Sequence, residues 1–357
     1  MNAHFIILIL FLSLGLFVFR RAHDKTDIRR YLMFCCVLLI LDSGLRNVAV
    51  GSDTYAYFLK YENVSQMSWP QVFHRFIDVY IHKDGKDAGY DVIQKAMSSL
   101  GVSFQLYLVI VACIFFGALY LLLDRFSFST RDIYIAFLIY LSLFYNFFSI
   151  TGIRQTISVA LGIISLLSLL DKYYVRFFVL VIFAFFIHKS AAVLLLFPIL
   201  RLFKNNTFVS VLCVIGFVVF AVYRDYFVSS FRDLAEYEEF VANRPISLML
   251  LLFGLSLISM YSLFKSKNEE YQILIRCYLP TFMWIPVLGN DSLFMRLVYY
   301  FDILLCAALP LAISNLKGKM VNTITVSLIV LLILHTIGNN TEYAFFWEEM
   351  ALDSVYN

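Results

Sequence analysis

The chain has 357 residues, of which 61% are hydrophobic and only 15% are charged, and its mean hydropathy is +0.81. This composition excludes a soluble domain of ordinary size. The net charge of +3 gives no reason to expect nucleic acid as a partner. We therefore expect one integral-membrane domain over residues 1–357.

Apolar stretches recur along almost the whole chain, and many approach the ~20 residues that cross a bilayer. They predict an all-α polytopic membrane protein with about twelve transmembrane helices. Two short stretches, 175–187 and 190–203, are either two spans or the two arms of a re-entrant hairpin. The predicted spans are 3–19, 31–47, 104–123, 132–150, 155–170, 175–187, 190–203, 207–223, 246–264, 271–288, 297–314 and 320–337.

Basic residues set the expected orientation of these helices. The short loops that we assign to the cytoplasm each carry at least two lysines or arginines, so both termini are predicted to face outward. The first span is followed rather than preceded by basic residues, which predicts a retained anchor instead of a signal peptide.

Two longer segments, 47–103 and 224–245, are then expected on the outer side. The segment 47–103 is too short for a separate enzyme domain. It contains VFHRFIDVYIH and DVIQKAMSSL, whose helical periodicity predicts short helices along the membrane surface.

Five ionisable residues lie where apolar stretches end, and the predicted topology brings all five to the outer face. They are Asp53, Arg154, His188, Lys189 and Arg296. A charge at the centre of a bilayer costs roughly 2.5–3.5 kcal/mol, so ionisable residues at membrane depth usually serve a function. Cations that converge with a carboxylate indicate a site for an anionic substrate carried on a lipid.

Each of these residues also has a structural alternative. Asp53 follows Gly51 and precedes Tyr57 by four residues, and it is either a helix cap or a site residue. Arg154 and Gln155 open a helix, where an arginine either lies at the interface or binds phosphate.

His188 is either a structural histidine or, beside Lys189 at the start of a helix, part of an anion site. Arg296 and Tyr300 fit an interfacial aromatic belt as well as a site. No second histidine or cysteine stands at ligand spacing from His188, and the chain has no HExxH motif or Gly-rich phosphate loop. We therefore expect no metal and no cofactor.

Five short motifs occur in a fixed order along the chain. They are Gly51, Asp53 and Tyr57; Asp87, Gly89 and Tyr90; Arg154 and Gln155; His188, Ser190 and Ala191; and Arg296, Tyr300 and Phe301. Together they resemble the EpsG-type branch of the Wzy-like polysaccharide repeat-unit polymerases, over roughly residues 40–305. Asp87 stands where the resemblance leads us to expect glutamate.

The resemblance implies a glycosyltransferase of the bacterial inner membrane with a GT-C-like helical fold and an active site that faces the periplasm. Its donor and acceptor would be glycans on undecaprenyl pyrophosphate, transfer would need no metal, and a chain-length regulator protein would be a further partner. Arg154 and Arg296 would stabilise the leaving pyrophosphate, and Asp53, or alternatively His188, would be the base. The expected substrate-binding residues are Arg46, Tyr57, Tyr90, Gln155, Lys189 and Tyr300.

Other functions share part of this pattern. An O-antigen ligase or another lipid-donor glycosyltransferase needs nearly the same physical chemistry. A flippase or transporter for lipid-linked sugars should instead show charges through the depth of the membrane and internal repeats.

Overall fold

The computed structural model describes residues 3–19, 24–85, 88–235, 246–288, 292–314, 320–338 and 342–352. These residues form helices and no strand, apart from one isolated antiparallel bridge between Arg46 and Phe345. The all-α class is therefore confirmed. Asp87 and residues 236–245 of the predicted second outer loop lie outside the described residues.

The chain divides into two compact units, Met1–Ala192 with Leu328–Asn357, and Val193–Ser327. The first unit contains α1 (Ala3–Val18), α2 (Lys25–Gly44), α3 (Thr54–Gln66), α4 (Trp69–Ile77), η1 (Asp78–His82), α5 (Ala88–Ser99), α6 (Phe104–Phe126), α7 (Thr130–Ile139), η2 (Tyr140–Phe144), η3 (Asn146–Thr151), α8 (Ile153–Leu170) and α9 (Tyr174–Ile187). The 3-10 helix η4 (Lys189–Leu195) begins in it.

The first unit is built on long apolar helices that pack in series, α2 against α6, α6 against α8 and α8 against α9. The hydroxyl of Ser158 on α8 donates to the carbonyl of Ala184 on α9 at 3.1 Å. Ser103 starts α6 by accepting a hydrogen bond from the backbone N–H of Leu106 at 3.3 Å, which satisfies one N–H of the first turn.

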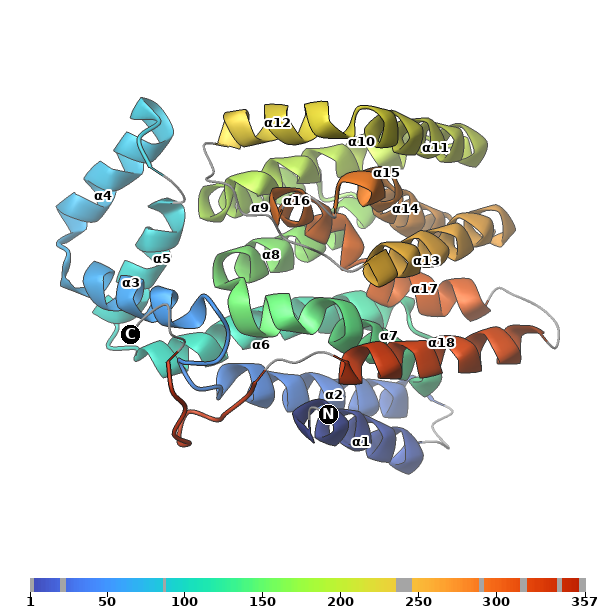
Figure 1. The fold of residues 1–357 in the computed structure, drawn as a ribbon, viewed down its shortest axis with the longest axis horizontal. Coiled ribbons are helices and arrows are strands. Elements are labelled where there is room, and N and C mark those ends of the chain that lie inside the picture. Colours follow the sequence, from blue (N-terminus) through green and yellow to red (C-terminus); the bar gives the residue numbers. More distant parts are fainter. Residues whose placement is uncertain are drawn as a thin grey trace. The chain divides into compact units, whose positions relative to one another are not determined.

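The short helices α3, α4 and α5 form a group of their own at one end of these long helices (Figure 1). α5 packs against both α3 and α4, and it also contacts α9. The segment predicted as an outer segment of surface helices is thus helical and is joined to the apolar helices through α5 and α9.

The second unit contains α10 (Leu196–Leu202), α11 (Asn206–Val222), α12 (Arg224–Ala235), α13 (Ile246–Lys265), α14 (Glu269–Tyr278), α15 (Pro280–Trp284), η5 (Ile285–Val287), α16 (Ser292–Asp302) and α17 (Leu305–Ser314). α18 (Met320–Ile337) starts in this unit and ends in the first. Within the second unit α11 packs against α15, and α13 packs against α17 and α14.

Three described helices are long and apolar enough to cross a membrane, namely Phe104–Phe126, Ile153–Leu170 and Leu248–Lys265. The number rises to five if two bent pairs, Asn206–Val222 with Arg224–Ser230 (82°) and Phe294–Asp302 with Leu305–Ser314 (46°), are each one span. The chain is a helical membrane protein. About twelve spans with both termini outward stays a prediction.

Four predicted spans are not single α-helices. The span 271–288 is divided into α14, α15 and η5, and the span 297–314 is divided between α16 and α17. The region 132–150 is α7 followed by the two π-helices η2 and η3, and 190–203 is a 3-10 helix followed by the seven-residue α10. π-helical turns often occur near functional sites. Here they end at Thr151, directly before Gly152 and the start of α8.

Candidate active site

The loop before α3 is tied to the end of η3, although about a hundred residues separate them in the chain. The carbonyl of Ile150 accepts hydrogen bonds from Arg46 Nη2 at 3.1 Å and from the Thr54 hydroxyl at 2.9 Å. Arg46 also donates to the carbonyl of Ser43, and its side chain is buried. Arg46 thus holds the loop 45–54 against η3.

Asp53 occupies the capping position of α3, but its side chain makes no capping hydrogen bond. Its carbonyl accepts the backbone N–H of Tyr57 at 3.0 Å, while the side chain is exposed. Gly51 turns the chain there with φ +82°, and a Cβ on it would lie 2.3 Å from Ile150 Cγ2. The turn therefore presents the carboxylate of Asp53 to solvent next to the end of η3.

Arg154, the second residue of α8, contacts Tyr57 on α3. Its Nε donates to the Tyr57 hydroxyl at 3.2 Å, and its Cζ lies 5.6 Å from the centre of the ring. This arrangement is a hydrogen bond combined with a cation–π contact. Arg154 is half-buried, and Gln155 beside it is buried. Two motifs that are far apart in the sequence thus meet.

The Tyr57 ring packs edge-on against Tyr90 on α5 at 5.9 Å, and an ion cluster adjoins this pair. Asp91, of which only 1% is exposed, lies with Oδ1 2.5 Å from Lys60 Nζ and with Oδ2 3.3 Å from Arg75 Nε. Lys60 also lies over the Tyr90 ring at 5.5 Å. We call Lys60, Arg75 and Asp91 the Asp91 cluster.

The pKa of Lys60 shows how the charges are distributed. Burial is the main cause that lowers this pKa, and the positive charges of Arg154 and Arg75 lower it further, while Asp91 raises it. The positive charges of Arg154 and Arg75 are therefore close enough to Lys60 to affect its protonation. Lys60, Arg75 and Arg154 carry three positive charges against the one negative charge of Asp91, and such an excess would suit an anionic ligand.

His188 and Lys189 lie at the end of α9 and the start of η4. His188 is buried, and its backbone N–H donates to the Ala184 carbonyl at 2.9 Å. Lys189 is exposed, with Nζ 5.8 Å from the centre of the Tyr80 ring on η1. The Tyr80 hydroxyl donates to the carbonyl of Phe186, so the end of α9 is joined to η1.

One hydrophobic cluster places these elements together. It contains Tyr90 of α5, Ile153 directly before Arg154, and Ile187 directly before His188, and Tyr57 packs against it. Asp53, Tyr57, Tyr90, Arg154 and His188 therefore belong to the same part of the first unit.

Arg296 and Tyr300 belong to α16 of the second unit. Arg296 is half-buried and Tyr300 is 2% exposed. Asp302, at the end of the same helix, is also buried.

Sequence reasoning missed the Asp91 cluster. In the sequence, Lys60 and Arg75 look like residues on the solvated face of amphipathic helices. Asp91 directly follows Tyr90, and no motif in the sequence marks it as a site residue. A carboxylate on the apolar face of a short helix is the signal that could have found it. Within the described residues no three His, Cys, Asp or Glu side chains come together as a metal site.

The fold is that of a helical membrane protein, and its candidate site contains a cluster of cations. The sequence model of the EpsG family matches residues 29–351, and the chain belongs to the EpsG family, a family of Wzy-like polymerases. This membership indicates a polysaccharide polymerase. No curated protein and no solved structure matches the chain.

Proposed function

We propose that the protein polymerises oligosaccharide repeat units carried on undecaprenyl pyrophosphate at the outer face of the bacterial inner membrane. The observation that carries this proposal is the contact of Arg154 with Tyr57 beside the Asp91 cluster. Arginine binds pyrophosphate oxygens through several N–H groups, and neighbouring lysine and arginine add charge. Side-chain cations would then supply the charge for which other enzymes use a metal ion.

In the proposed reaction, a hydroxyl oxygen of the acceptor glycan attacks the anomeric carbon of the donor. The bond from that carbon to the pyrophosphate oxygen breaks, and undecaprenyl pyrophosphate leaves with the bonding electrons. Arg154 stabilises the charge that develops on the leaving oxygen. One such donor is typically worth ~10²–10³ in rate.

The proton of the attacking hydroxyl passes to a base. We assign this role to Asp53, whose carboxylate is exposed and does not cap α3, with His188 as the alternative. A carboxylate near several cations is a weak base, but it accepts the proton as the hydroxyl becomes acidic in the transition state.

The remaining assignments follow the order of the motifs. Arg296 is proposed as a second cation for the leaving group, and Arg46 as a positioning residue for the loop that carries Asp53. The proposed substrate contacts are Tyr57, Tyr90, Gln155, Lys189 and Tyr300. A chain-length regulator is the proposed protein partner.

The test is a gel of the surface polysaccharide from the source cell after deletion of the gene. We expect the ladder to collapse to a single-repeat band and to return with the wild-type gene, but not with Arg154→Ala. Loss of all repeat-bearing product would favour a ligase or a flippase instead. An unchanged ladder would overturn the proposal.

A further inference from the structure

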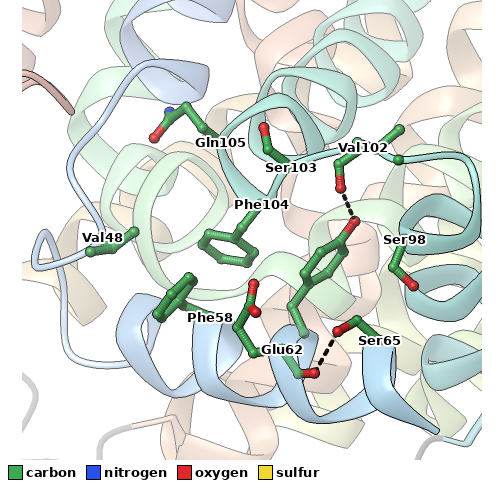
Figure 2. A pocket seen from close by; sticks show the side chains of 11 residues that line it. Val48, Phe58, Glu62, Ser65, Ser98, Val102, Ser103, Phe104 and Gln105 are labelled. Carbon is green, nitrogen blue, oxygen red and sulfur yellow. Dashed lines mark hydrogen bonds between the residues drawn. The ribbon is translucent and has the colours of Figure 1, made fainter.

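A second feature of the outer helices is a pocket of about 460 Å³ between α3 and the turn from α5 to α6. Phe58, Tyr61 and Phe104 form its aromatic side, and Glu62, Ser65 and Ser98 contribute polar atoms. Figure 2 shows the side chains of Phe58, Glu62 and Phe104 close together at this pocket. Its volume is within the ~300–1,000 Å³ that is usual for small-molecule sites.

The aromatic side of the pocket is held in place by its own contacts. The rings of Phe58 and Phe104 meet edge-on at 5.5 Å, and the Tyr61 hydroxyl donates to the Val102 carbonyl at 2.6 Å. The residues that form this wall belong to α3, α6 and the turn between α5 and α6, so the wall is not a single mobile loop. A preformed wall lowers the entropy cost of binding a ligand.

The pocket and the candidate active site share one helix. Tyr57 and Lys60 of α3 face Arg154 and the Asp91 cluster, while Phe58 and Glu62 of the same helix line the pocket. Residues three or four apart lie on one helix face, so Tyr61 of the pocket wall lies beside Tyr57 as well as beside Phe58. The pocket and the candidate site therefore occupy adjoining faces of α3, and a molecule in the pocket would lie next to the site.

The chemistry of the lining residues selects the ligand. Among the described residues no lysine or arginine lines the pocket, and the carboxylate of Glu62 would repel a pyrophosphate. A lipid tail would remove water from the charged carboxylate of Glu62, which is unfavourable because no basic residue in the described part of the chain lines the pocket to pair with it. A sugar suits both the aromatic and the polar residues of the pocket. Its C–H faces pack on aromatic rings, and its hydroxyls donate to carboxylate and serine oxygens.

We propose that this pocket binds sugar residues of the acceptor glycan and so presents its attacking hydroxyl to the donor at Arg154. This inference rests on the proposed function. It separates the two substrates by charge, with the donor pyrophosphate at the cations and the neutral part of the acceptor in the pocket.

The test uses the purified full-length protein in lipid nanodiscs. The probe is the one-repeat oligosaccharide released by mild acid from the cell's own lipid-linked repeat. This oligosaccharide lacks pyrophosphate, so it cannot act as a donor. Its dissociation constant is measured by calorimetry for the wild type and for each variant.

We expect Glu62→Gln to weaken binding by about tenfold, because a hydrogen bond to a charged group is lost while the shape stays the same. Ser98→Phe should fill the pocket and abolish binding. Arg154→Ala should bind the oligosaccharide like the wild type while it fails to polymerise. Asn63→Ala changes an exposed residue of the same helix outside the pocket and serves as the matched control.

Wild-type affinity in Glu62→Gln, or no binding by the wild type, would overturn the pocket assignment. If the ladder still collapses on gene deletion in that case, the proposed function stands without the pocket. An unchanged ladder on deletion overturns the proposed function whatever the affinity. If Ser98→Phe fails to fold, the exposed Glu62→Gln still decides the question.

Discussion

Two buried carboxylates of the first unit, Asp91 and Asp42, have different kinds of partners. Asp91 is paired with Lys60 and Arg75, whose side chains keep 26% and 44% of their surface exposed. Asp42 on α2 is surrounded by His4, with Nε2 at 3.1 Å, and by the Tyr145 hydroxyl at 2.6 Å. The ring of Tyr343 stacks on His4 at 3.8 Å.

The difference lies in what surrounds each carboxylate. Asp42 joins α1, α2, the turn between η2 and η3, and the chain after α18, so its contacts connect elements of the fold. Asp91 holds two partly exposed cations beside the Tyr57–Arg154 contact. A buried ion pair is weak support for stability in itself. Under the proposed function, the Asp91 cluster would maintain charge for a ligand, whereas the Asp42 contacts connect elements of the fold.

The largest effect is expected from Arg154→Lys. Lysine supplies a point charge without the planar set of N–H donors, and it loses the Nε contact with Tyr57. The polymerisation rate should fall by ~10²–10³, measured with lipid-linked repeats in proteoliposomes. Arg176→Lys, on the exposed start of α9, is the matched control and should leave the rate unchanged. Wild-type activity in Arg154→Lys would exclude a bidentate role.

The variants Asp91→Asn and Asp42→Asn test whether the two buried carboxylates differ in their effect on the reaction. Each should lower the free energy of unfolding by about 1–3 kcal/mol, because each removes the charge of a buried carboxylate from the polar groups that contact it. The rate per folded molecule should fall by about 10–100-fold in Asp91→Asn, because Lys60 and Arg75 shift. In Asp42→Asn this rate should stay near the wild-type value. Equal loss of rate in both variants would remove the distinction.

A smaller effect on the same cluster is expected from Gly89→Ala. A Cβ at Gly89 would lie 2.2 Å from the carbonyl oxygen of Phe186, so α5 must move away from α9 with Tyr90 and Asp91. We expect unfolding to become easier by about 1–3 kcal/mol, as in other overpacked sites, and a several-fold loss of rate.

Gly117→Ala on α6 is the control for this change. Nothing lies within 4 Å of a Cβ at Gly117, so the substitution should stabilise the helix by about 0.5–1 kcal/mol and leave the rate unchanged. Thermal unfolding in detergent and the polymerisation rate check both variants. Similar losses in the two alanine variants would show that the approach of α5 to α9 is not what matters.

The sequence predicted much of the fold because hydropathy and helical period are local properties. The apolar stretches become helices, and the periodic stretches within 47–103 become α4, η1 and α5. The π-helices between α7 and α8 were not predictable, since widened turns keep the same apolar composition. The number of spans that cross the bilayer stays a prediction for a related reason. Helices such as α1 and α9 are apolar, but they have fewer residues than a straight helix needs to cross a bilayer.

The candidate site was predicted in part. The motif order indicated that Tyr57 and Arg154 serve one site, and the structure places them in contact. The partnership of Lys60 and Arg75 with Asp91 depends on how α3 and α4 pack on α5, which no local pattern encodes. The predicted substrate contact of Arg46 stays a prediction, and its guanidinium donates hydrogen bonds to the carbonyls of Ser43 and Ile150, which no local pattern indicated.

The smallest expected effect concerns the pH dependence of Lys60. Burial, with smaller contributions from Arg154 and Arg75, holds the pKa of Lys60 below its usual value. The ammonium therefore loses its proton at a lower pH than an exposed lysine does. Polymerisation should decline on the alkaline side as this cation is lost. Lys60→Arg should move that decline to higher pH, because arginine stays protonated throughout.

The free energy of unfolding should rise over the alkaline range in which the polymerisation rate declines. Because the pKa of Lys60 is lower in the folded state, the unfolded state binds more protons as the pH approaches the folded pKa, and the free energy of unfolding rises with pH there. Activity and stability should thus diverge in the wild type over the same alkaline range. In Lys60→Arg this divergence should disappear. Both expectations are checked by measuring the polymerisation rate and the free energy of unfolding across that pH range in the wild type and in Lys60→Arg. If the rate declines at the same alkaline pH in both proteins, the charge of Lys60 is not used in the reaction.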